Sequence, residues 1–240
     1  LNIPFLGQFG ACSTMAQTLG IASLFVESGA ARRAAAVTSS HFCSAERQFR
    51  FPLEYGGQRP PTSQWTATAA GAVLLGSRQD YLNAKVGLKA VTFGRITDFG
   101  IKDANNMGAA MAPAAAQTLM DFFSDTESSP QEFDLILTGD LGYVGSELLE
   151  EILQKENIDI KPVHNDCGMM IYDREKQDVH AGGSGCGCSA AILCSAILQQ
   201  MEAGQLHRVL FVATGALMSP TSSQQGENIP SVAHLIFLNA

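Results

Sequence analysis

The sequence has few charged residues and no long apolar run. Only 16% of its 240 residues are charged, and 15 Lys and Arg are outnumbered by 23 Asp and Glu, for a net charge of -8. Because nucleic-acid binding depends on neutralising phosphates, this deficit of positive charge argues against a general nucleic-acid-binding protein. No apolar run approaches the roughly 20 residues that a membrane-spanning helix needs, so we expect no transmembrane segment.

The six cysteines have the spacing of neither a disulfide framework nor a zinc site. Cys186 and Cys188 are too close for a usual zinc knuckle, and no second Cys/His pair accompanies them. The run from His164 to Cys167 lacks distant metal-binding partners and is expected to form a turn. With 46% hydrophobic residues the chain can build a large core without cross-links. We therefore expect reduced cysteines, no resident metal and no cofactor.

Helical and strand-like patterns alternate along the chain, which predicts an α/β protein whose sheets are covered by helices. The same order, a helix that ends at a glycine followed by two apolar strands, occurs twice. In the first copy the helix is predicted at residues 10–27 and the strands at 34–38 and 71–76. In the second copy the helix is predicted at 186–202 and the strands at 209–214 and 231–238. The interval from Cys12 to Thr38 is 26 residues, and so is the interval from Cys188 to Thr214. We interpret the pattern as an internal duplication.

The second half begins with elements that the first half lacks. They are predicted as strands and helices in alternation at residues 86–93, 106–123, 133–138 and 144–156, followed by short strand-like stretches at 162–164 and 169–172. If the halves are duplicates, roughly 80–100 residues of the first half are expected to be absent from the start of this chain. We therefore divide the chain into a first half, 1–84, that is incomplete at its start, and a second half, 85–240.

Two duplicated halves, with a cysteine opening a helix in the first, resemble the thiolase and ketoacyl synthase superfamily, which implies a layered α-β-α-β-α fold. Longer strings resemble the stage V sporulation protein AD family of endospore-forming bacteria, over essentially the whole chain: Pro4–Met15, Thr38–Cys43, Ala45–Arg59 and Ala213–Pro220. The family resemblance implies a protein that binds dipicolinic acid and helps to move it into the developing spore. It also implies membrane partners from the same operon and a peripheral position at the inner spore membrane. The superfamily implies a homodimer, formed through the strand that leads into Cys12.

Cys12 stands where the superfamily keeps its nucleophile. Unpaired amides at a helix N-terminus would lower its pKa, and an inert cysteine at a tight junction is an equally good interpretation. The superfamily's catalytic His and Asn partners are absent, because Asp140 follows the strand at 133–138 and residues 181–188 contain neither type. We therefore expect no enzymatic activity. One alternative is an acyltransferase that uses Cys12 with His180 or with a histidine from the part expected to be absent at the start of the chain. The other is a scaffold for membrane partners with a vestigial pocket.

A site for a planar aromatic dicarboxylate needs N–H donors, a cation and a flat apolar wall. The segment after the strand at 34–38 is rich in arginine and aromatic residues. The alternative interpretation is a dimer-interface or surface loop in which its arginines pair with Glu46 and Glu54. Helix-terminal amides and the Gly-rich loop of the second half are expected to complete the site, and calcium could bridge through Asp140. The candidate ligand-binding residues are Cys12, Ser13, Thr14, His41, Arg47, Arg50, Asp140 and Gly183.

Overall fold

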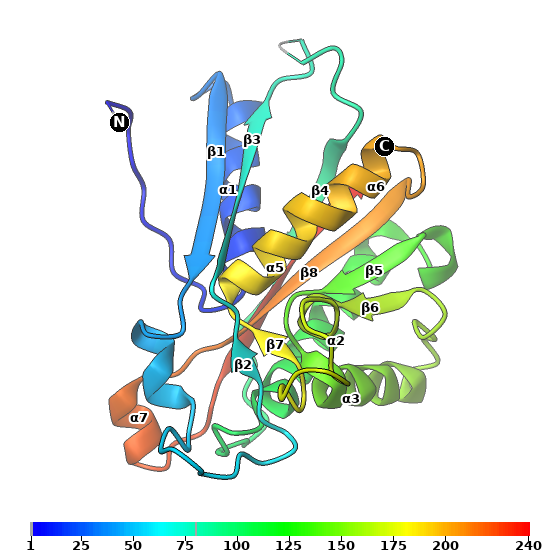
Figure 1. Cartoon of the computed structure of the whole chain (residues 1–240). Helices are drawn as coiled ribbons and strands as arrows, with labels where there is room; N and C mark the ends of the chain where they lie inside the picture. Colours follow the sequence, from blue (N-terminus) through cyan, green and yellow to red (C-terminus); the bar gives the residue numbers. More distant parts are fainter. Residues whose placement is uncertain (1, 80) are drawn as a thin grey trace.

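The computed structural model describes residues 2–79 and 81–240. A five-stranded mixed sheet forms the centre of the second half (Figure 1). Its strands lie in the order β4 (Gly87–Phe93), β9 (Ser231–Asn239), β8 (Arg208–Ala216), β5 (Leu135–Thr138) and β6 (His164–Asp166). β5 is parallel to both β6 and β8, whereas β9 is antiparallel to β8 and β4. β8 is buried along almost its whole length, as expected of a strand covered on both faces.

Helices cover both faces of this sheet, and alternate residues of β8 divide between them. Leu210 and Val212 belong to the hydrophobic core beneath α2 (Met107–Thr126) and α3 (Gly142–Lys155). Val209 and Phe211 belong to a second core, which contains residues of α1 and α5. The helices of that second core have the bounds α1 Thr14–Glu27, α5 Cys186–Ile192, a π-helical turn Leu193–Ile197 and α6 Leu198–Glu202.

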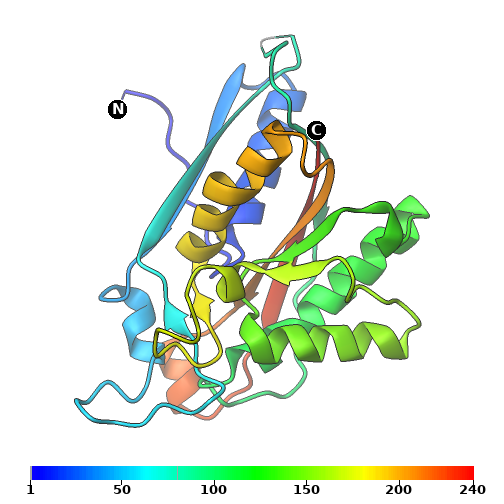
Figure 2. The same ribbon diagram turned by 45° about the vertical axis from the view of Figure 1, so that its right-hand side comes forward.

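A two-stranded antiparallel sheet of β1 (Arg33–Ser40) and β3 (Ala69–Gly76) packs on the other side of α1 and α5. The layers are therefore the helices α2 and α3, the five-stranded sheet, the helices α1 and α5, and the β1–β3 sheet (Figure 2). The outer face of the last sheet exposes Val37 and Leu74. The order α1-β1-β3 repeats as α5-β8-β9, with the same antiparallel strand pairing, so the predicted duplication is confirmed.

Short elements join the two halves and border the end of the structure where α1 and α5 begin. β2 pairs in parallel with β7, so that the segment after β1 is tied to the Gly-rich loop before α5. The remaining short elements have the bounds η1 Ala45–Phe49, β2 Trp65–Thr66, η2 Pro130–Glu132, α4 Cys167–Met170, β7 Gly183–Ser184 and α7 Pro220–Gln224.

Several local predictions differ from the structure. The strand expected to lead into Cys12 is not present within residues 2–9, and the stretch predicted as strand-like at 162–164 is mostly a turn, with β6 beginning at His164. The stretch predicted as a strand at residues 169–172 begins within α4 instead, because the side chain of Asp166 accepts from the amide of Met169 at 3.3 Å and caps that helix. The run His164–Cys167, predicted as a turn, consists of β6 and the start of α4. In the described parts of the chain, we find no helix with the length and apolar character needed to cross a membrane.

Candidate functional site

A cavity of about 380 Å³ lies at the N-terminal end of α1, between the two halves. The first half contributes Cys12, Glu46 and Arg50 to its wall, and the second half contributes Met107 and Cys186. This is a volume typical of small-molecule sites, which are mostly apolar and contain a few placed polar groups. The predicted meeting of the two halves around Cys12 is therefore present as a cavity.

Cys12 lies on the wall of this cavity, two residues before α1 begins. Burial raises the pKa of its thiol well above the usual value of 9.0, and the carboxylates of Asp140 and Glu46 raise that pKa further. The prediction that the helix N-terminus lowers this pKa is wrong, because desolvation and the two nearby carboxylates dominate. At neutral pH the cysteine is a protonated thiol, which is a poor nucleophile.

Alkylation by iodoacetamide is expected to test this protonation state directly. At about pH 8, Cys12 should react at least about tenfold more slowly than the exposed Cys43, because a raised thiol pKa reduces the reactive thiolate fraction. Mass spectrometry of peptides after timed quenching measures both rates in one sample. Labelling of Cys12 as fast as Cys43 would show that its thiol is activated.

The amides of Ser13 and Thr14, predicted to bind a carboxylate, already have acceptors. Ser13 N–H donates to the carbonyl of Gly10 at 3.0 Å, and Thr14 N–H donates to that of Ala11 at 3.3 Å. Ala11 has a φ of 50°, a left-handed conformation that forms this tight turn before the helix. Of the two residues only Thr14 lines the cavity, whereas Ser13 is fully buried.

Asp140 is fully buried behind Cys12 and does not belong to the cavity wall. Its carboxylate accepts from Ser184 Oγ at 2.7 Å, from the amide of Gly185 at 2.8 Å and from Thr214 Oγ1 at 2.9 Å. Ser184 Oγ lies 4.0 Å from Cys12 Sγ. Burial raises the pKa of Asp140 above 3.8, against the effect of these hydrogen bonds. The residue thus supports the strand–helix junctions beneath the cavity.

Gly183 also lies behind the wall. It pairs with Trp65 where β7 meets β2, and its carbonyl accepts from Gln64 Nε2 at 3.1 Å. The Gly-rich loop therefore reaches the cavity through Cys186 at the start of α5, and not through Gly183 itself.

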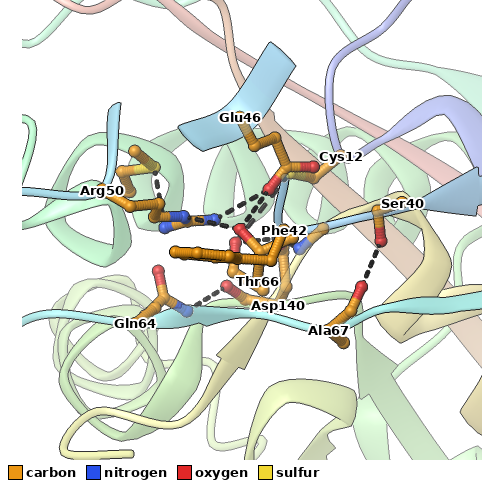
Figure 3. A network of polar contacts seen from close by, with 12 residues as sticks. Cys12, Ser40, Phe42, Glu46, Arg50, Gln64, Thr66, Ala67 and Asp140 are labelled. Carbon is orange, nitrogen blue, oxygen red and sulfur yellow. Dashed lines mark hydrogen bonds and ion pairs between the residues drawn. The ribbon is translucent and has the colours of Figure 1, made fainter. Parts of the chain in front are cut away.

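Arg50 is the buried cation of the site (Figure 3). Its Nη2 donates to Glu46 Oε2 at 3.0 Å, and its Nε donates to Thr66 Oγ1 at 2.9 Å. Its Nη1 lies 3.5 Å from the thioether of Met107, which is a weak acceptor and its hydrogen-bond partner among the described residues. The edge of the guanidinium that carries Nε and Nη2 is therefore paired with Thr66 and Glu46. At Nη1, a carboxylate could replace the sulfur of Met107 as the acceptor.

The other two predicted basic residues lie outside the cavity wall. His41 is exposed, and its Nδ1 accepts from the amide of Cys43 at 3.0 Å. Arg47 is also exposed and does not line the cavity. Arg59 pairs with Asp178 at 2.6 Å and also lies outside the cavity wall. Arg50 does pair with Glu46, as the alternative interpretation expected, but it is buried in the cavity wall and not in a surface loop.

Of the predicted candidate residues only Cys12, Thr14 and Arg50 line the cavity, and the lining residues that sequence reasoning did not name include Glu46, Met107 and Met218. Cys186 lies in the Gly-rich loop that was predicted to face the pocket. A signal was available for Glu46, since a glutamate four residues before an arginine predicts an ion pair on one helical turn. The two methionines come from the second half, and nothing in the spacing of the repeat indicates that they approach this end of α1.

The family model described as "Stage V sporulation protein AD (SpoVAD)" matches residues 1–239. This chain belongs to that family. It is 49% identical over 234 residues to the stage V sporulation protein AD of Bacillus subtilis (strain 168). The aligned region covers 98% of this chain and 68% of that protein. The family resemblance inferred from the sequence is therefore confirmed.

Solved structures with a similar fold are thiolase-like enzymes. The 3-oxoacyl-[acyl-carrier-protein] synthase III from Aquifex aeolicus VF5 has a TM-score of 0.57 and 14% identity, over 96% of this chain and 65% of its own. The E117Q form of Xanthomonas campestris OleA has a TM-score of 0.58 and 13% identity, over 96% of this chain and 63% of its own. This chain thus spans less than two thirds of both proteins. The likeness confirms the predicted thiolase-like α/β fold and carries no conclusion about activity.

Proposed function

We propose that this protein binds dipicolinic acid, as the free acid or as its calcium chelate, in the cavity beside Cys12. Membership of the stage V sporulation protein AD family supports a role in sporulation, and the sequence resemblance implies this ligand. The observation that carries the proposal is Arg50, a guanidinium buried in the wall of a small cavity with its Nη1 edge against a thioether. A carboxylate of the ligand would replace that weak acceptor with a charge-assisted pair.

The cavity wall also matches the apolar part of such a ligand. Phe9 precedes α1, Phe49 is the last residue of η1, and Met218 lies in the connection between β8 and β9. Rings and thioethers of this kind suit a flat aromatic ligand. The wall thus combines one buried cation with an apolar surface, as the ligand requires.

Binding without turnover is part of the proposal. The Cys12 thiol is held protonated, and Asp140 stands behind it in place of the superfamily's catalytic histidine. No histidine lines the cavity within residues 2–79 and 81–240. Acyl transfer requires an activated nucleophile and a donor for the developing oxyanion, so these features favour a binding protein over an acyltransferase.

We further propose that the protein works as a homodimer, delivering its ligand to stage V sporulation membrane proteins at the inner membrane of the developing spore. The segment that leads into Cys12 supports the dimer, because its large apolar side chains are exposed to solvent: Ile3, Phe5, Leu6 and Phe9. Burial of such a segment against a second copy would remove considerable apolar area from water.

Calorimetric titration of the full-length protein with dipicolinate is the direct test, with and without calcium and with benzoate as the control. We expect saturable binding and a raised unfolding temperature with dipicolinate, and much weaker binding of benzoate, which carries a single carboxylate. Absence of both heat and thermal stabilisation would contradict the proposal. Labelling of Cys12 by an acyl-CoA, with release of free CoA, would instead support the acyltransferase.

A further inference from the structure

Two charged residues face the cavity, and they are paired with each other. Among the described residues that line the wall, Glu46 and Arg50 are the charged ones, joined at 3.0 Å between Oε2 and Nη2. Thr66 Oγ1 donates to the same Oε2 at 2.8 Å. The side chain of Arg50 is 6% exposed and that of Glu46 is 25% exposed, so the pair is largely removed from water.

The surrounding titratable groups add no positive charge. Facing Glu46 are Cys12 from the turn before α1, Cys186 from the start of α5 and, behind them, Asp140 from the loop after β5. Burial raises the pKa of Cys186 to about 11 and that of Cys12 well above 9.0, so both thiols are neutral at pH 7. The residues of the cavity wall therefore carry a net charge near zero.

A dicarboxylate dianion entering this cavity meets a guanidinium that already has a carboxylate partner. The ligand and Glu46 would then place several negative charges around one buried cation. Burying uncompensated charge is strongly unfavourable, and carboxylates that share one site retain a proton between them. A proton or a divalent cation must therefore accompany the dianion.

We propose that Glu46 balances the charge of the bound ligand, sharing Arg50 and one proton with the carboxylate of free dipicolinate and facing the cation of its calcium chelate. Binding of the free dianion is therefore coupled to uptake of about one proton, which resides between Glu46 and the ligand carboxylate. Binding of the chelate needs no proton, because calcium supplies the positive charge and accepts oxygen ligands. This inference rests on the proposed function and identifies the residue that sets its pH dependence.

The affinity for free dipicolinate depends on pH because its binding is linked to the uptake of a proton. If one proton is taken up on binding, the affinity for free dipicolinate falls up to tenfold for each unit by which the pH rises. The affinity for the preformed calcium chelate stays constant over the same range. In Glu46→Gln, a neutral amide takes the place of the carboxylate, so proton uptake disappears and the affinity for free dipicolinate no longer depends on pH.

Calorimetric titration in buffers of different ionisation enthalpy measures the number of protons taken up. The full-length protein, Glu46→Gln and the control Glu54→Gln, whose carboxylate is exposed outside the cavity wall, are titrated with free dipicolinate in EDTA and with preformed calcium dipicolinate. We expect about one proton with the free acid for the unmodified protein and the control, about none for Glu46→Gln, and about none for the chelate in all three.

Binding of free dipicolinate without proton uptake would overturn the role of Glu46 and leave the proposed function intact. Uptake that persists in Glu46→Gln would also overturn it and would assign the proton to another carboxylate, such as Asp140. Failure of the unmodified protein to bind dipicolinate in either form would overturn the proposed function itself. If Glu46→Gln does not fold, the buffer series on the unmodified protein still decides whether a proton is taken up, and Glu46→Asp, which keeps the carboxylate, is expected to retain that uptake.

Discussion

Replacing Arg50 by lysine is expected to weaken dipicolinate binding by about 10- to 100-fold. Lysine keeps the positive charge but loses the planar fork that binds a carboxylate through two nitrogens. Its single nitrogen would have to replace the separate nitrogens that contact Glu46, Thr66 and the ligand. A charge-assisted hydrogen bond contributes about 1.5–3 kcal/mol, which corresponds to roughly this loss of affinity. Calorimetric titration of both proteins with dipicolinate measures the change.

Arg47→Lys is the matched control for this substitution. Arg47 lies three residues away in the same segment, but its side chain is exposed and lies outside the cavity wall. Its replacement is expected to change the affinity less than about twofold, since exposed charges are well screened. An equal loss of affinity in both variants would place the ligand on the outer surface of η1 instead of in the cavity.

The stability of Arg50→Lys must be measured beside its affinity. Glu46 and Thr66 both contact the guanidinium, so a poorly placed lysine could loosen η1 without any direct effect on the ligand. Binding that is weakened while the unfolding temperature changes little would assign the effect to recognition. A large fall in both quantities would assign it to the folding of the segment.

The sequence predicted the fold well because the relevant signals are local. Helix α1 ends at Glu27 with Gly29 beyond it, and strands β8 and β9 are long apolar runs that belong to covered strands. The duplication appears as a repeated order with equal spacing, which does not depend on tertiary contacts. Where a side chain decided the local structure, as Asp166 does by capping α4, the pattern of apolar residues misled the prediction.

The site was harder to predict because its chemistry depends on contacts between distant residues. The pKa of Cys12 is set by burial and by Asp140, whose hydrogen-bond partner Ser184 lies 172 residues beyond the cysteine. Helix position alone indicated the opposite shift. Of the basic residues in the segment after β1, sequence could not show that Arg50 turns inward while Arg47 faces solvent, because the 3-10 turn that separates them is stabilised by tertiary contacts.

Removing the carboxylate of Asp140 is expected to produce the largest loss of stability among these variants. Asp140→Ala leaves three buried donors without their acceptor: the hydroxyls of Ser184 and Thr214 and the amide of Gly185. Each such group costs about 1–3 kcal/mol, and since neighbouring effects do not add fully, we expect the free energy of unfolding to fall by about 3–5 kcal/mol. Urea denaturation at neutral pH measures it, with the exposed Asp178→Ala as a control that should change little.

Asp140→Asn removes the charge of this residue and keeps one of its two acceptor oxygens. Burial raises the pKa of Asp140 above 3.8, so the folded state retains its proton over a range in which the unfolded chain has lost it. The contribution of Asp140 to stability is therefore greatest at low pH and declines as the pH rises through the raised pKa. Asparagine cannot titrate, so the stability advantage of the unmodified protein over Asp140→Asn should shrink with rising pH. A difference in stability between the unmodified protein and Asp140→Asn that stays constant with pH would mean that Asp140 titrates normally despite its burial. A loss of unfolding free energy in Asp140→Ala no larger than in Asp178→Ala would mean that the hydrogen bonds of Asp140 behind Cys12 do not support the fold.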